Sequence, residues 1–270
     1  MKKSAVSRTL LSVLTILVFV FFLFPFAWMF LASFKTQVQI MSTESLFRFV
    51  PTLINYQHVF GSYNFLRFMA NSFVVAAGAT LVSLLLGLPA AYAMARNQFH
   101  KLAAVILIAR MIPPITFLIP WFILFSKVHL VDTYTGLILS NMVVVLPFII
   151  WVMIPYFDST PLEIEYAGMI DGCTRTQIFV KLVLPISGPG IITGSLLSFI
   201  FTWNNFLFSV IFAGDKTKTL PLAVFNFMSY SNIDWGALMA AACVITLPII
   251  VIAIFTHRYI VSGLSAGIGK

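Results

Sequence analysis

The sequence predicts an all-α integral membrane protein with six transmembrane helices. Charged residues make up 9% of the chain and apolar residues 60%, whereas a soluble domain carries roughly 25% charged residues. The apolar residues gather into windows near or above the roughly 20 residues that cross about 30 Å of hydrocarbon as a helix. Because five of the six windows contain no Asp, Glu, Lys or Arg, they cannot form a water-soluble surface.

The six predicted spans follow one another along the whole chain. They cover residues 10–32, 68–95, 102–126, 134–157, 190–213 and 236–256. The first span follows Lys2, Lys3 and Arg8, as the apolar region of a signal peptide does. It is much longer than the 7 to 15 or so residues of such a region. We therefore expect it to be retained as a helix and to be followed by an outer loop up to residue 66.

The second, third and fourth spans are joined by the short connections 96–101 and 127–133, which predicts that they are antiparallel neighbours. The third span holds Arg110, the only charged residue in any window, close to Pro113 and Pro114. Proline removes a backbone donor and kinks a helix, so these prolines predict a kink in the third span. The fifth and sixth spans carry no charged residue.

The distribution of basic residues predicts that both termini lie in the cytoplasm. With an inner N-terminus, the outer segments hold six Lys and Arg residues and the inner segments hold nine, and inner loops are enriched in these residues. The nine are Lys2, Lys3, Arg8, Arg96, Lys101, Arg175, Lys181, Arg258 and Lys270. The net charge of +8 therefore belongs mainly to anchors beside the membrane, and no basic stripe predicts nucleic-acid binding.

The cytoplasmic segment 158–189 predicts two short helices. Thr160, Pro161 and Glu163 form the pattern of a capped helix start, and this helix should end near Gly172. Thr174 and Gln177 repeat the capping pattern. The second helix should then place Ile178, Phe179, Leu182 and Val183 on one face until Pro185 ends it.

The spacing within this segment resembles the EAA loop of the permease subunits of binding-protein-dependent ABC importers. The matching positions are Tyr166-Ala167-Gly168, Gly172, Leu182 and Leu184-Pro185. Tyr166 stands where the motif has Glu, so Glu165 or Glu163 is expected to supply that charge. The segments Leu88 to Arg96, Arg110 to Pro114 and Arg258 to Gly263 are similar to the carbohydrate-type, maltose permease-like branch.

The resemblance implies that residues 67–257 form the transmembrane domain and that residues 258–270 form a cytoplasmic tail. It also implies that the loop is a coupling helix held in a groove of an ATPase subunit. The coupling residues so implied are Glu163, Glu165, Tyr166, Ala167, Gly168, Asp171, Gly172, Phe179 and Pro185.

The sequence has no Walker A motif: Gly269-Lys270 ends the chain without a following Ser or Thr. The chain is therefore expected to be a transport subunit and not an enzyme, with no catalytic residue, metal site or cofactor of its own. The resemblance implies two copies of an ATPase that bind ATP and Mg, a homologous second permease and an extracytoplasmic solute-binding protein. It places the chain in a bacterial or archaeal plasma membrane.

Polar side chains within the spans are candidates for a translocation path, because they are costly in lipid. Asn204 and Asn205 beside Trp203 suit an uncharged hydroxylated solute, such as a sugar, although helix packing explains them equally well. Asn141 and Tyr92 are weaker candidates. Arg110 should pair with carbonyls freed near Pro113 and Pro114, with another subunit or with an anionic solute.

Three alternatives differ in what they require of the sequence. An ion-coupled secondary transporter usually carries intramembrane carboxylates, and all eight acids here lie outside the spans. An intramembrane enzyme is disfavoured because the four His residues are scattered without a catalytic motif. An ABC permease for a non-sugar solute stays open, since the path residues do not identify the solute.

Overall fold

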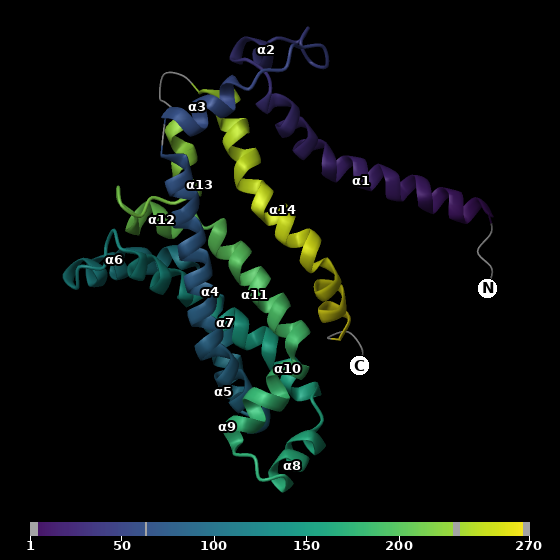
Figure 1. Ribbon diagram of the computed structural model, residues 1–270, viewed down its shortest axis with the longest axis vertical. Coiled ribbons are helices and arrows are strands. Elements are labelled where there is room, and N and C mark those ends of the chain that lie inside the picture. The colour runs from purple at the N-terminus through teal and green to yellow at the C-terminus, as the bar shows by residue number, and fades with distance from the viewer. Residues whose placement is uncertain (1–4, 63, 229–232, 267–270) are drawn as a thin grey trace. The chain divides into compact units, whose positions relative to one another are not determined.

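The computed structural model describes residues 5–62, 64–228 and 233–266, and in this part of the chain all regular structure is helical (Figure 1). Its contacts divide the chain into two compact units. Unit 1 joins Met1–Leu66 to Val224–Leu247, and unit 2 joins Arg67–Ala223 to Pro248–Lys270. Lys2, Lys3 and Lys270, which the topology prediction counts, lie outside the described residues.

Unit 1 contains α1 (Ala5–Ser33), α2 (Gln37–Met41), α3 (Ile54–Ser62), η3 (Val224–Phe227) and the first part of α14 (Trp235–Ala266). Side chains 10 to 27 of α1 are all exposed, as expected of an apolar helix that lipid or another subunit covers. Beyond α1, the side-chain amide of Asn55 donates to the carbonyls of Ser33 and Lys35 at 2.7 and 2.8 Å. Asn55 therefore ties α3 to the end of α1.

Unit 2 is built on α4, whose first two residues belong to unit 1, and on α7. Its helices are α4 (Phe65–Arg96), α5 (His100–Arg110), η1 (Pro114–Phe117), α6 (Leu118–Lys127), α7 (Tyr134–Ser159), α8 (Leu162–Ile170), α9 (Arg175–Ile178), η2 (Phe179–Val183), α10 (Leu184–Ile186), α11 (Gly188–Trp203), α12 (Leu207–Phe212), α13 (Leu220–Ala223) and the end of α14. A Cβ added to Gly78 of α4 would lie 2.5 Å from the side chain of Ile138. This glycine lets α4 approach α7 closely, as small residues do between membrane helices.

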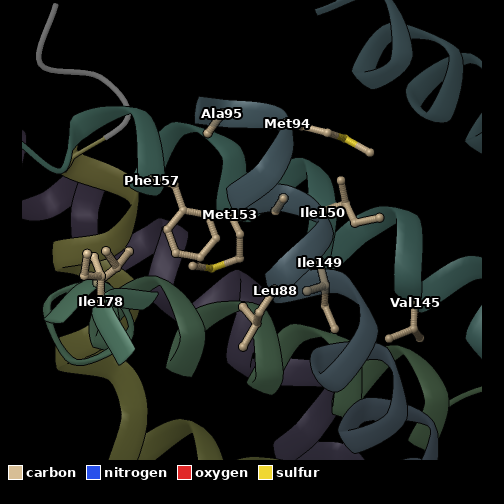
Figure 2. Close-up of a cluster of buried hydrophobic side chains, with 11 residues drawn as sticks. Leu88, Met94, Ala95, Val145, Ile149, Ile150, Met153, Phe157 and Ile178 are labelled. Carbon is tan, nitrogen blue, oxygen red and sulfur yellow. The ribbon is translucent and has the colours of Figure 1, made fainter. Parts of the chain in front are cut away.

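The inner half of unit 2 holds a buried apolar cluster between α4, α7 and the segment that follows α8 (Figure 2). Leu88 of α4, Ile149, Met153 and Phe157 of α7, and Ile178 of α9 all point into it. Ile149, Met153 and Phe157 lie four residues apart and are fully buried. They form one stripe of α7, and Ile178 extends the cluster into the cytoplasmic segment.

Four of the predicted spans are single helices: α1, α4, α7 and α14. The third is a bent pair, since Lys101–Arg110 and Pro114–Lys127 meet at 85°. Two consecutive prolines without backbone donors explain the break, so the single kinked helix expected over 102–126 is corrected to two separate helices. A second pair, Arg175–Ile186 and Gly188–Trp203, meets at 77°. By length and composition the described chain has four candidate spans, or up to six if each bent pair is one span. The first helix of the second pair lies in the segment 158–189, which was predicted to be cytoplasmic, so only Gly188–Trp203 of that pair falls in the predicted fifth span.

Two helices end at residues other than those predicted for their spans. The fifth span was expected to run to residue 213, but α11 ends at Trp203 and α12 follows after a break. At the other end, α14 continues to Ala266 through most of the predicted tail 258–270, and residues 267–270 lie outside the described residues.

Candidate coupling loop and translocation surface

The segment 158–189 folds as the predicted pair of helical arms, with α8 as the first and α9, η2 and α10 as the second. They join at Gly172, whose φ of +81° is a conformation that glycine adopts without a Cβ penalty. Asp171 is the exposed C-cap of α8. The predicted bend at Asp171-Gly172 is therefore the bend found.

The start of α8 differs from the prediction. Pro161 is its N-cap and makes no side-chain cap, while Thr160 is the C-cap of α7 and its hydroxyl donates to the carbonyl of Tyr156 at 3.1 Å. The expected capping box of Thr160 and Glu163 is thus absent from this part of the structure, because the threonine closes the preceding helix.

The second arm begins as predicted and ends later. Thr174 and Gln177 form the expected capping box, with both reciprocal hydrogen bonds present. Ile178 and Val183 are buried, and Phe179 lies against Tyr92 and Phe157, with ring centroids 4.9 and 6.2 Å apart. Pro185, which was expected to end the arm, lies within α10, and the chain turns at Ser187 instead. The chain is helical without a break from Arg175 to Ile186, and the π-helical segment η2 directly before α10 is a local adjustment of the kind that accommodates a proline within a helix.

The face of α8 that carries Glu165 and Gly168 is buried against the rest of unit 2. Gly168 is buried, and a Cβ there would lie 2.7 Å from Leu182 and 3.2 Å from Ile178. Glu165 is only 5% exposed and is bound by Arg96 and Tyr92. The expectation that Glu165 presents its charge to a partner is therefore corrected: of the two acids considered, only Glu163 is exposed.

The outer face of α8 carries an uncovered apolar stripe. Its members are spaced at helical intervals and are Leu162, Tyr166, Met169 and Ile170, which is 86% exposed. Ala167 beside them is also exposed. In Figure 1, α8 lies at the extreme end of unit 2, next to the inner ends of α4 and α7. An apolar stripe at such a tip is typical of a surface that a partner covers.

The candidate translocation residues cluster at the break after α11. Asn204 is exposed, and its side-chain amide donates to the carbonyl of Ile200 at 3.0 Å, while the Asn205 side-chain oxygen accepts from the backbone N–H of Phe208 at 3.0 Å. Trp203 is buried. The break opens a pocket of 560 Å³ that is lined by Ile200, Phe201, Asn204, Asn205, Phe206 and Leu207.

The other polar candidates lie elsewhere. Asn141 is buried and donates to the carbonyl of Leu137 on its own helix, and Tyr92 lies beneath α8. The guanidinium of Arg110 lies 4.7 Å from the centroid of the Phe148 ring. This cation–π contact takes the place of the expected pairing with carbonyls, and the structure does not group these three residues with the asparagines.

Comparison with known proteins shows where this fold belongs. Residues 83–265 match the family of the binding-protein-dependent transport system inner membrane component. The chain belongs to this permease family. It is 32% identical to the trehalose/maltose transport system permease protein of Thermococcus litoralis, over 99% of this chain and 98% of that one. It is 34% identical to the trehalose transport system permease protein of Mycobacterium tuberculosis, over 96% of both.

A solved structure shares the permease fold. It is a chain of a bacterial ABC transporter involved in the import of the acidic polysaccharide alginate, with a TM-score of 0.80, 21% identity and coverage of 96% of this chain and 99% of that one. This similarity concerns the fold. The chain is thus a multi-pass membrane permease, a transport component, with a type I permease architecture.

Two residues of the permease that sequence reasoning did not single out prove to organise its ends. At the inner end, Arg96 contacts Glu165 of α8 and the carbonyls of Phe157 and Thr160 at the end of α7; the sequence marked it as an inner basic residue but not as part of the loop. At the outer end, Asp132 precedes α7 and accepts hydrogen bonds from the backbone N–H groups of Gly214, Lys216 and Thr217 and from the Thr217 hydroxyl.

The Asp132 carboxylate has a shifted pKa. Burial alone would raise this pKa, but the hydrogen bonds from Thr217, Gly214 and Lys216 together lower it below the ordinary value of 3.8, because they favour the charged form. Asp132 therefore clamps the loop after α12 onto the turn before α7 as an anion.

Proposed function

We propose that the chain is the permease subunit of an ATP-driven importer, in which it forms half of the translocation path for a sugar or related hydroxylated solute. The observation that supports docking to an ATPase is the exposed apolar stripe on the outer face of α8. Leu162, Tyr166, Met169 and Ile170 are exposed although the opposite face of the same helix is buried in the protein. A cytoplasmic helix with this pattern requires an apolar partner, and an ATPase subunit supplies both that cover and the energy.

The partners follow from the same reasoning. Two copies of an ATPase would bind ATP and Mg, so this chain needs no cofactor of its own. A second, homologous permease would close the open pocket at Asn204 and Asn205, and an extracytoplasmic binding protein would deliver the solute. The assembly would lie in the plasma membrane of a bacterium or archaeon, as befits relatives from both kinds of organism.

The sugar class is supported by the pocket and by the relatives. Asparagine amides donate and accept hydrogen bonds, and Phe201 and Phe206 add flat apolar faces, a combination that suits the hydroxyls and the apolar patches of a sugar ring. Two of the similar permeases are named for trehalose or for trehalose and maltose. No Asp or Glu lines the described pocket, which disfavours a cationic solute.

Co-purification tests the ATPase contact. Ile170→Glu places a charge at the most exposed residue of the apolar stripe. It is expected to lower ATPase capture by the solubilised permease by about tenfold or more, since burying an unpaired charge costs several kcal/mol. Val180→Glu is the matched control, because Val180 is an exposed apolar residue of the second arm outside the stripe. Equal capture by the two variants would show that the stripe is not the docking surface.

Uptake of labelled trehalose into proteoliposomes tests the solute. Asn204→Leu is expected to reduce uptake while ATPase capture stays at the wild-type level, because the Asn204 side chain bonds only to its own helix within the described residues. Asn141→Leu, in a buried position on α7, serves for comparison and should impair assembly instead. Wild-type uptake after Asn204→Leu would remove this residue from the path.

A further inference from the structure

The side chain of Arg96 joins three helices at the inner end of unit 2. Its Nε donates to Glu165 Oε1 of α8 at 2.5 Å. Its Nη1 donates to the carbonyl of Phe157 at 2.8 Å, and its Nη2 donates to the carbonyl of Thr160 at 3.2 Å. These carbonyls end α7, where a positive charge is favourable. One guanidinium of α4 therefore holds the end of α7 and the inner face of α8 together.

Both oxygens of the Glu165 carboxylate have hydrogen-bond partners within the chain. Arg96 binds one oxygen, and the Tyr92 hydroxyl donates to the other at 2.6 Å. The two side chains of the ion pair are only 15% and 7% exposed. Tyr92 and Arg96 stand four residues apart, so they lie on the same face of α4. Charge-assisted hydrogen bonds of this kind are short and directional, and they fix the orientation of α8 as well as its distance.

The remaining contacts of α8 lead to the second arm. Gly168 rests on Ile178 and Leu182, and Phe179 in turn packs on Tyr92 and Phe157. Van der Waals contacts of this kind allow α8 to slide against the second arm. The two oxygens of the Glu165 carboxylate, in contrast, are each hydrogen-bonded to a side chain of α4. A force on α8 parallel to the membrane therefore reaches α4 mainly through Glu165, whereas α7 is also joined to α8 by the backbone of Thr160 and Pro161.

We propose that Tyr92, Arg96 and Glu165 form a clasp that transmits the displacement of α8 to the inner ends of α4 and α7, with Arg96 as the positioning residue. The inference rests on the proposed function, because it assumes that an ATPase moves α8. It adds that the acid next to the family motif faces inward and transmits the movement, while the docking surface is the apolar stripe. The clasp stays closed throughout the cycle, so that α8, α4 and α7 move as one body.

The test measures trehalose transported per ATP hydrolysed by the complete complex in proteoliposomes. Glu165→Gln removes the charge of the clasp and keeps the docking stripe intact. It is expected to retain ATPase capture within about twofold and to lower transport per ATP by roughly tenfold, in the range of typical coupling between sites. Arg96→Lys keeps the charge but cannot reach the two carbonyls and the carboxylate together. Its transport per ATP should therefore lie between the lower value of Arg96→Met, which removes the charge, and that of the wild type.

Tyr92→Phe keeps the test decisive if Glu165→Gln does not fold. It removes one hydrogen bond to the carboxylate and should lower transport per ATP by roughly three- to tenfold. Tyr156→Phe is its control, since the buried Tyr156 hydroxyl has no hydrogen-bond partner among the described residues, and its ratio should equal that of the wild type.

The outcomes separate the two proposals. ATPase capture with a lowered ratio for Tyr92→Phe, and an unchanged ratio for Tyr156→Phe, supports the clasp. ATPase capture with an unchanged ratio for Glu165→Gln or Tyr92→Phe overturns the clasp and leaves the proposed function standing. A wild-type permease that neither retains an ATPase nor transports trehalose overturns the proposed function and the clasp with it.

Discussion

Replacing Asp132 should loosen the outer end of the permease, and the structure gives the size of the effect. Asp132→Ala removes the acceptor of three backbone N–H groups and of the Thr217 hydroxyl. Because Asp132 is partly exposed, water replaces some of these bonds, and the loss amounts to about 2 kcal/mol. The residue also has φ of 56°, which Asp tolerates better than Ala, adding about 1 kcal/mol.

A total near 3 kcal/mol corresponds to a fall in Tm of roughly 6–12 °C, measured by scanning fluorimetry in detergent at pH 7. Asp132→Asn keeps the backbone tolerance and the bonds to Oδ1, so its fall should be roughly 2–4 °C. Asp215→Asn is the control, because Asp215 lies exposed in the same loop and should leave Tm unchanged. Equal Tm values for Asp132→Ala and wild type would refute the clamp.

The pH dependence of the Asp132 contribution has a definite sign. Hydrogen bonds outweigh burial and hold the pKa of this carboxyl below its ordinary value of 3.8 in the folded chain. Its stabilisation is therefore complete above that ordinary value and is lost as the pH falls through the lower, folded pKa. The Tm difference between wild type and Asp132→Asn should shrink on acidification below pH about 4, and a constant difference would contradict the assignment.

Two further predictions concern the coupling loop. Gly172→Ala should destabilise the joint of the two arms by about 1 kcal/mol or more through its positive φ alone, since no atom lies within 4 Å of the new Cβ; faster proteolysis between the arms would report this, and unchanged cleavage would speak against it. Thr174→Ala removes the cap of the second arm and should cost about 1 kcal/mol, whereas Thr160→Ala should weaken the end of α7 and leave the start of α8 intact. Hydrogen exchange at the two helix starts distinguishes these effects.

The two threonines show how far sequence patterns reach. Thr160 and Thr174 carry the same capping signature, and only Thr174 uses it. The difference is the neighbouring helix, because α7 ends at Ser159 with Thr160 as its C-cap, so the N-cap position of α8 falls on Pro161 and not on Thr160. A local pattern predicts a helix start well when no other helix ends beside it.

The apolar windows predicted the helices but not their breaks. Asn204 and Asn205 separate two segments that are equally apolar, so hydropathy alone merges α11 and α12 into one span. The role of Glu165 could not be predicted from the residues next to it in the sequence either. Its partners Tyr92 and Arg96 are 73 and 69 residues away in the chain, and only the packing of α4 against α7 brings them beneath α8.

The Arg96 contacts also bear on how the chain is made. Arg96 is one of the inner basic residues that orient the chain during insertion, yet in the folded permease its charge is neutralised by Glu165. Those residues are 69 positions apart, so at about 5–20 residues per second the ribosome takes ~3–14 s to supply the acid. We expect Arg96 to lack its partner acid during this interval, and an unpaired cation favours retention of the end of α4 on the cytoplasmic side. The same guanidinium thus serves first as a topological signal and only later as part of the folded interior.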